Sequence, residues 1–116
     1  MIKYLKTHEW LNTENGESGI SNYAVEHLGD VVFIELPEIG KIVKKDESIA
    51  VIESHKAASD IFSPVSGKII AVNKELEDSP EKINENPTTW LYKIDISNVE
   101  EINELLDEET YKNSLE

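Results

Sequence analysis

Residues 37–43 read Pro-Glu-Ile-Gly-Lys-Ile-Val, and residues 64–70, which follow 27 positions later, read Pro-Val-Ser-Gly-Lys-Ile-Ile. In each copy a proline ends an extended run, and a glycine permits a turn before the next strand. Ile34 and Ile61 align at the same offset. A unit of this size cannot bury one of its faces alone, so the two copies must pack on each other. The repeat predicts two β-sheets related by an approximate two-fold axis, in a flattened sandwich or barrel.

Extended runs elsewhere in the chain point to the same fold class. β-Branched and apolar residues predict strands over residues 31–36, 49–52, 68–72 and 90–96. No long linker divides the 116 residues, so we expect a single mainly β domain over residues 1–116.

Short helices are expected at the periphery of this domain. Residues 23–28 form the first, capped by Ser21 or Asn22 and ended by Gly29. A short helical turn is expected from Ser79 through Ile83. A C-terminal helical segment is expected over about residues 98–113, with Val99, Ile102, Leu105 and Leu106 on one face.

The charge balance excludes several classes of function. Acidic residues number 24 against 11 basic residues, and the formal net charge is -13. Every basic residue is a lysine, so the chain has no guanidinium group to bind phosphate with two hydrogen bonds. Because its negative charge also repels anionic partners, we expect neither nucleic acid nor an anionic membrane surface as a partner. The acidic side chains concentrate in residues 75–116, where they either attract a basic partner or simply keep the surface solvated.

The absence of certain residue types narrows the chemistry further. The chain has no cysteine, which excludes disulfides, thiolate catalysis and thiolate metal sites. Its three histidines are far apart in the sequence, so no spacing typical of a catalytic nucleophile and its base can be identified. We therefore do not expect an independent enzyme. No apolar run approaches the roughly 20 residues that span a bilayer, and the N-terminus has no signal-peptide pattern. We expect an intracellular protein.

Residues 53–60, Glu-Ser-His-Lys-Ala-Ala-Ser-Asp, lie between the two copies of the repeat. Ile52 and Ile61 continue the strand pattern on either side, which predicts a tight hairpin with Lys56 at its exposed tip. A lysine amine on its four-carbon stem can be acylated through an amide bond. From this pattern alone, Lys56 is either a modification site or one solvated lysine among 11.

Short motifs along nearly the whole chain resemble one family. They are Thr7-His8-Glu9-Trp10, Gly19-Ile20-Ser21-Asn22-Tyr23-Ala24, Leu28-Gly29-Asp30, Glu35-Leu36-Pro37 with Gly40, Glu53-Ser54 with Lys56-Ala57-Ala58-Ser59-Asp60, Ser63-Pro64 with Ser66-Gly67, Val72-Asn73, Asn86-Pro87 and Trp90-Leu91. The chain resembles the glycine cleavage H proteins, a lipoyl-carrier family with a hybrid barrel-sandwich fold.

The resemblance implies that Lys56 is the attachment site of lipoic acid. It also implies that Gly40 and Gly67 flank the hairpin, and that the enzymes which attach the cofactor recognise Glu53. Biotin carriage is disfavoured, because the flanking methionines typical of biotin carriers are absent.

The resemblance further implies a carrier that is not itself catalytic. Its partners are a pyridoxal-phosphate glycine decarboxylase that loads an aminomethyl group on the arm, a tetrahydrofolate-dependent aminomethyltransferase that takes it, and a dihydrolipoyl dehydrogenase that reoxidises the arm. A lipoyl or octanoyl ligase or transferase supplies the cofactor. The implied carrier is a monomer in the bacterial cytoplasm or the mitochondrial matrix.

Three more residues match family positions around a cleft that holds the loaded arm. Glu9 and Asp60 match positions near the aminomethyl nitrogen, and His27 matches a position that contacts the arm. A carboxylate suits the first task because the amine is protonated near neutral pH. Without the resemblance, Glu9 and Asp60 would be interpreted as ordinary solvated acids. His27 would be interpreted as a histidine that the helix dipole stabilises at the end of a helix.

Some residues depart from the family pattern. His55 stands where the family usually has valine, residues 11–18 are short and polar, and residues 86–90 lack the usual glycines. Two alternatives follow: an H-like lipoyl carrier for another pathway, such as sulfur oxidation with heterodisulfide-reductase-like enzymes or a lipoate relay, and a binding domain without lipoate.

Overall fold

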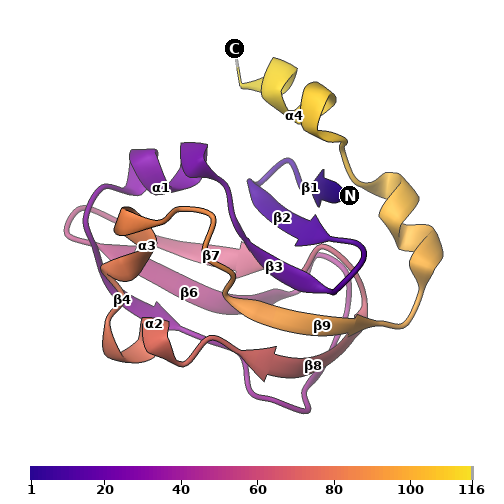
Figure 1. Ribbon diagram of the computed structural model, residues 1–116, viewed down its shortest axis with the longest axis horizontal. Helices are drawn as coiled ribbons and strands as arrows, with labels where there is room; N and C mark the ends of the chain where they lie inside the picture. The colour runs from indigo at the N-terminus through magenta and orange to yellow at the C-terminus, as the bar shows by residue number, and fades with distance from the viewer. Residues whose placement is uncertain (116) are drawn as a thin grey trace.

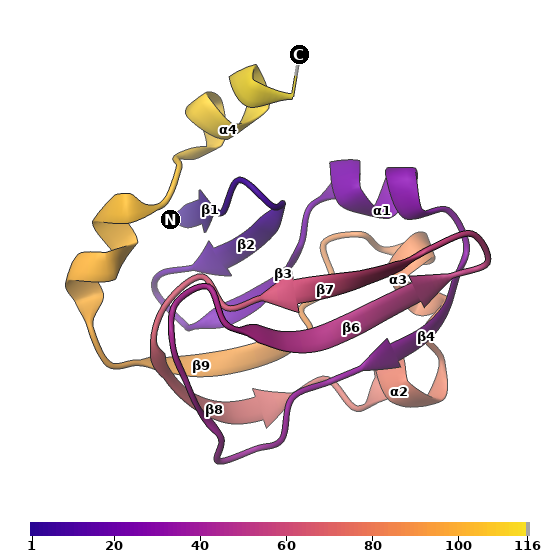
Figure 2. The same ribbon diagram turned by 180° about the vertical axis from the view of Figure 1, so that it is seen from behind.

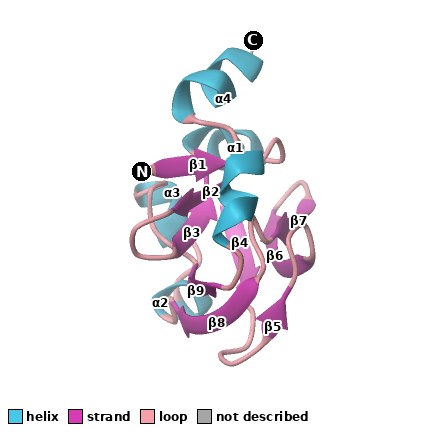
Figure 3. Cartoon of the chain, turned by 90° about the vertical axis from the view of Figure 1, so that its right-hand side faces the viewer, coloured by secondary structure: helices cyan, strands magenta, loops and turns pink. Residues whose placement is uncertain are grey.

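The computed structural model describes residues 1–115 and contains two antiparallel sheets (Figure 1). The larger sheet has the spatial order β1 (Ile2–Tyr4), β2 (Glu9–Asn12), β3 (Glu17–Ile20), β9 (Tyr92–Ile96), β8 (Gly67–Val72) and β5 (Ile42–Val43). The smaller sheet has the order β4 (Val31–Glu35), β6 (Ser48–Ser54) and β7 (Ala58–Phe62). The molecule measures 37 × 36 × 20 Å, and Figure 3 shows the layers in side view. The expected mainly β, flattened two-sheet architecture is confirmed.

Each pair of strands related by the sequence repeat lies within one sheet: β4 and β7 in the smaller sheet, β5 and β8 in the larger. An offset of 27 positions carries the bounds of β4 onto those of β7, and these two strands flank β6 on opposite sides. The same offset carries β5 onto residues within β8. These two strands are antiparallel partners, with Ile42 opposite Lys68. The two-fold relation between the copies stays a prediction.

Apolar side chains from both sheets form one buried core. Ile52, Ile61, Ile69 and Ile94 are each at most 2% exposed, because alternate residues of a strand face the same side. Burying each such side chain stabilises the fold by about 1.5–3 kcal/mol.

Short helices lie around this core. They are α1 (Asn22–Leu28), α2 (Glu75–Asp78), α3 (Lys82–Glu85), a 3-10 helix η1 (Val99–Glu104) and α4 (Glu108–Ser114). Val25, Leu76 and Ile83 seal the core from α1, α2 and α3 and are at most 3% exposed. None of the helices within residues 1–115 has the length and apolarity that a membrane crossing requires.

The expected cap and end of α1 are confirmed. The Ser21 hydroxyl accepts a hydrogen bond from the Ala24 N–H at 3.3 Å. Gly29 follows the helix with a φ of 78°, and its N–H donates to the Val25 carbonyl at 3.2 Å. The expected turn from Ser79 through Ile83 is present, because the N–H groups of Lys82 and Ile83 donate to the Ser79 and Pro80 carbonyls at 3.1 and 3.2 Å. Ser79 also ends α2, and α3 begins at Lys82.

The C-terminal segment differs from the expected helix over residues 98–113. It is divided between η1 and α4, and Leu105 between them is extended, with φ of -85° and ψ of 157°. The cause is tertiary, because Leu106 exchanges two backbone hydrogen bonds of 2.8 Å with Tyr4 in an isolated bridge. Those bonds take backbone groups that a continuous helix would need. Val99 is 67% exposed, so the expected apolar face does not form as one unit.

The two glycines of the repeat serve different purposes. Gly40 lies in the turn after β4 with a φ of 94°, which is the role that the repeat predicts. Gly67 instead begins β8 beside the backbone of β9, and a β-carbon there would lie 2.2 Å from the Asp95 carbonyl oxygen. Its expected turn role is therefore wrong, because close backbone approach is what requires glycine here.

This difference predicts different costs for the two alanine substitutions. Gly67→Ala should lower the free energy of unfolding by about 3 kcal/mol, because the new methyl group displaces the β9 backbone. Gly40→Ala should lower the free energy of unfolding by only about 1 kcal/mol. Its methyl group would lie in open space, so the cost comes from the left-handed φ alone. Urea unfolding of both variants measures the difference, and equal costs would contradict this account.

Candidate functional site

A tight hairpin between β6 and β7 holds Lys56 at its tip, next to α1 in two opposite views (Figures 1 and 2). His55 and Lys56 form an exposed bend beyond the last paired residues. Ser54 closes this bend, because its N–H donates to the Ala57 carbonyl at 2.8 Å and its hydroxyl accepts from the Ala57 N–H at 3.2 Å. The bend leaves both His55 and Lys56 exposed to solvent.

The stem of Lys56 lies along the glycine that ends α1. A β-carbon at Gly29 would lie 3.7 Å from Lys56 Cε and 3.9 Å from Nζ. Asn84 of α3 fixes this segment, because its amide group donates to the Gly29 carbonyl at 2.8 Å and accepts from the Val31 N–H at 2.9 Å. The Lys56 side chain therefore lies beside a firmly held backbone segment.

A cleft of about 290 Å³ is bounded by β6 and β7, α1 and the start of β2. We call it the β7 cleft. It brings together three residues from the sequence analysis, Glu9, His27 and Asp60. Its other lining residues are Thr7, His8, Ile20, Tyr23, Ala24, Leu28, Ile52, Ser59 and Ile61. Because Leu28 lines the cleft and the next residue touches Lys56, the cleft adjoins the lysine hairpin.

Glu9 is a buried carboxylate, 1% exposed, held by neutral donors. Its Oε2 accepts from the Phe62 N–H at 2.7 Å, and the Thr7 hydroxyl donates to its Oε1. Burial raises the pKa of the Glu9 carboxyl, and the hydrogen bonds from Phe62 and Thr7 oppose part of that rise. Among residues 1–115 no cation forms an ion pair with Glu9. The cleft therefore offers a cationic group a pre-oriented carboxylate without a competing partner.

His27 lines the cleft as part of a cluster of tilted aromatic rings. Its ring centroid lies 4.1 Å from that of Tyr23, and the Tyr23 centroid lies 5.0 Å from that of His8. Burial lowers the pKa of His8, and the nearby His27 lowers it further. His8 also has a φ of 85°, and its Nδ1 is 2.6 Å from the hydroxyl of Tyr111.

His8 is a cleft residue to which the sequence analysis assigned no role. It belongs to the motif Thr7-His8-Glu9-Trp10, but its partner Tyr111 is 103 positions away. No local pattern could therefore indicate the pairing.

The remaining site candidates divide into two groups. Glu53 lies in β6, where it pairs with Ala58 at the base of the Lys56 bend. Gly40 and Gly67 lie outside this hairpin, near the junction of β5 and β8, where the Gly40 N–H donates to the Ile69 carbonyl at 2.7 Å. The structure therefore does not bring these two glycines together with the lysine.

The environment of Glu9 predicts a pH-dependent effect on stability. The pKa of Glu9 is higher in the folded chain than its ordinary value of 4.5, because burial disfavours the charged carboxylate. The contribution of Glu9 to stability is therefore fully present below pH 4.5 and is lost as the pH rises through the folded-state pKa. Glu9→Gln removes this penalty, so its free energy of unfolding relative to the original chain should increase from pH 4 to pH 7. Urea unfolding across this range tests it, with exposed Glu38→Gln as the control. Parallel profiles for the original chain and Glu9→Gln would contradict the expectation.

Comparisons with known proteins give one family. The family model of the glycine cleavage H-protein matches residues 2–116. The glycine cleavage system H protein of Stenotrophomonas maltophilia is 52% identical over 99% of this chain and 92% of its own length. That of Thermotoga maritima is 51% identical over 97% of this chain and 94% of its own. The crystal structure of a glycine cleavage system H protein from Mycobacterium marinum superposes with a TM-score of 0.89 at 36% identity, over 98% of this chain and 95% of that one. The chain belongs to the glycine cleavage H-protein family.

Proposed function

We propose that this chain is the lipoyl carrier of its glycine cleavage system and that lipoate is attached through an amide bond to Lys56 Nζ. Proteins of this family carry lipoate on a lysine and work with the other components of the system. The observation that carries the assignment to Lys56 is its position, at an exposed hairpin tip that adjoins a cleft with an unpaired carboxylate.

The residues around the lysine fit a lipoyl arm. Ala57 and Ala58 leave the amine uncovered for an attaching enzyme. The β7 cleft offers apolar surface from Leu28, Ile52 and Ile61, which suits a chain of methylene groups. The Glu9 carboxylate lies in the same cleft, which suits an amine carried by the arm.

When bound, lipoate supplies a dithiolane that takes up the aminomethyl group and carries two electrons. The chain itself supplies position and protection. Glu9 and Asp60 would stabilise a protonated amine in the cleft, and the His27 ring would contact the arm. Glu53, at the base of the bend, forms part of the surface that attaching enzymes recognise.

The chain catalyses no step in this proposal. It presents its cargo in turn to a pyridoxal-phosphate glycine decarboxylase, a tetrahydrofolate-dependent aminomethyltransferase and a dihydrolipoyl dehydrogenase. Attachment to one flexible arm keeps the cargo at a high effective concentration at each active site. A lipoyl carrier for another pathway would share the hairpin, but identities of 51–54% to proteins named glycine cleavage system H protein favour the first assignment.

Lys56→Arg should abolish lipoylation without unfolding the protein, because the tip is exposed and guanidinium is not acylated by the same chemistry. Intact mass and peptide mapping after coexpression with a lipoate-attaching enzyme measure the modification. Exposed Lys68→Arg is the matched control and should be lipoylated fully. Lipoate found on a lysine other than Lys56 in the unaltered chain would overturn the assignment.

Glu9→Gln and Asp60→Asn should each speed the loss of the aminomethyl group from the loaded carrier. Asp60 is exposed, so its effect should stay below about fivefold, whereas buried Glu9 should have the larger effect. The measurement is the release rate of the loaded group at pH 7. Glu38→Gln and Asp95→Asn, which are exposed and line no part of the β7 cleft, are the controls. Unchanged release in the double variant would remove both carboxylates from the proposed role.

A further inference from the structure

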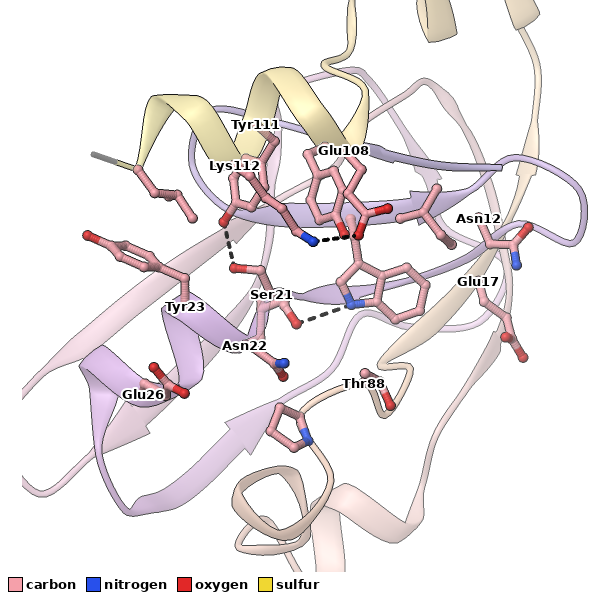
Figure 4. Close-up of a pocket in the computed structure, with 16 residues that line it drawn as sticks. Asn12, Glu17, Ser21, Asn22, Tyr23, Glu26, Thr88, Glu108, Tyr111 and Lys112 are labelled. Carbon is pink, nitrogen blue, oxygen red and sulfur yellow. Dashed lines mark hydrogen bonds and ion pairs between the residues drawn. The ribbon is translucent and has the colours of Figure 1, made fainter.

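A second and larger hollow lies between α4 and the β2–β3 hairpin (Figure 4). We call it the α4 groove. Its volume is about 510 Å³, within the range of sites that bind small molecules or side chains. Tyr4, Trp10 and Tyr23 line it and are each partly exposed. The groove therefore presents aromatic surface that the chain itself leaves uncovered.

The aromatic walls are rigidly held. Tyr4 stacks on Tyr111 of α4, with centroids 4.2 Å apart and planes within 3°. The Trp10 indole N–H donates to the Ile20 carbonyl at 3.1 Å. The indole also packs directly on Gly19, where a β-carbon would lie 2.9 Å from the ring. Rigid aromatic side chains contribute contact area to binding at little entropic cost.

The edges of the groove are acidic. Figure 4 shows Glu17, Glu26 and Glu108 around it, and Lys112 is the only basic residue among its described lining. Lys112 is already paired with Glu108 at 3.1 Å. Within residues 1–115, Glu17 and Glu26 form no ion pair. Two uncompensated carboxylates beside aromatic faces complement a cation, through Coulomb attraction and through the ring quadrupoles.

The α4 groove lies next to the β7 cleft. Ile20 and Tyr23 line both. The Tyr111 hydroxyl, in the wall of the groove, lies 2.6 Å from Ser21 Oγ and 2.6 Å from Nδ1 of His8, which lines the cleft. A protein seated in the groove would therefore lie directly beside the site that we propose for the arm.

We propose that the α4 groove is a docking site for a segment of a partner enzyme that presents a lysine or arginine beside an apolar side chain. The proposal rests on the proposed carrier function, which requires enzymes that hold the carrier while they use its arm. The acidic edge excludes anionic occupants such as phosphorylated cofactors. The formal net charge of -13 would also steer a basic partner surface toward the carrier.

The test measures binding of the lipoylated full chain to the purified decarboxylase, aminomethyltransferase and dihydrolipoyl dehydrogenase by calorimetry at low salt. The groove variant is the triple substitution Glu17→Gln, Glu26→Gln and Glu108→Gln. Its matched control carries Glu38→Gln, Asp95→Asn and Glu100→Gln, three exposed acids that do not line the groove. Both variants change the net charge equally, so the control accounts for long-range electrostatics.

A second substitution guards against loss of fold. Lys112→Gln removes the one cation among the described residues of the groove lining and should tighten binding about twofold to threefold, an effect that misfolding cannot produce. Exposed Lys44→Gln, outside the groove, is its control and should leave the dissociation constant unchanged within about 1.5-fold.

For at least one enzyme, the groove variant should raise the dissociation constant about tenfold and the control less than about threefold. Equal weakening by groove and control variants, or no weakening by either, would overturn the docking site while leaving the carrier function intact. If none of the three enzymes binds the unaltered lipoylated chain, the carrier function fails and the docking site with it.

Discussion

The hydrogen-bonded ladder between β6 and β7 determines where Lys56, Glu53 and Asp60 of the proposed site lie. Its register runs from Ser48↔Phe62 to Glu53↔Ala58. This register turns Ile61 into the core, while its neighbour Asp60 contributes to the edge of the β7 cleft. A slip by one residue would reverse the two faces, exposing the isoleucine and burying the carboxylate. The pairing thus fixes the core and the cleft together. It also places Lys56 in the bend that connects the two strands beyond their last pair, Glu53↔Ala58.

Glu9 shows how the fold and the site share one group. Its carboxylate links β2 to the end of β7 through the Phe62 N–H, 53 positions away. Burial makes its charge costly, and the hydrogen bonds from Phe62 and Thr7 offset only part of that cost. A carboxylate held in this way needs no rearrangement to receive a cation, so the structural link also prepares the cleft for an amine.

Tyr111 connects the end of the chain to both hollows. Through Tyr4 it stiffens the α4 groove, and through His8 it reaches the β7 cleft. Ser21, its other partner, caps α1, the helix that carries Tyr23 and His27. The place where we propose that partners dock and the place where we propose that the arm rests are therefore built on one set of hydrogen bonds and stacked rings.

Local sequence determined the repeat, the main strands, the cap and end of α1 and the bend at Lys56, because each depends on neighbours within a few residues. Turn glycines, capping hydroxyls and alternating apolar residues act over such distances. Three features were decided only by the tertiary structure. Leu106 bridges to Tyr4 and so divides the C-terminal helix, the β9 backbone approaches Gly67 closely, and His8 pairs with the Tyr111 hydroxyl. These features depend on contacts between residues far apart in the chain, such as the 103 positions between His8 and Tyr111. Their energies arise only when the sheets have packed, so no local pattern in the sequence carries them.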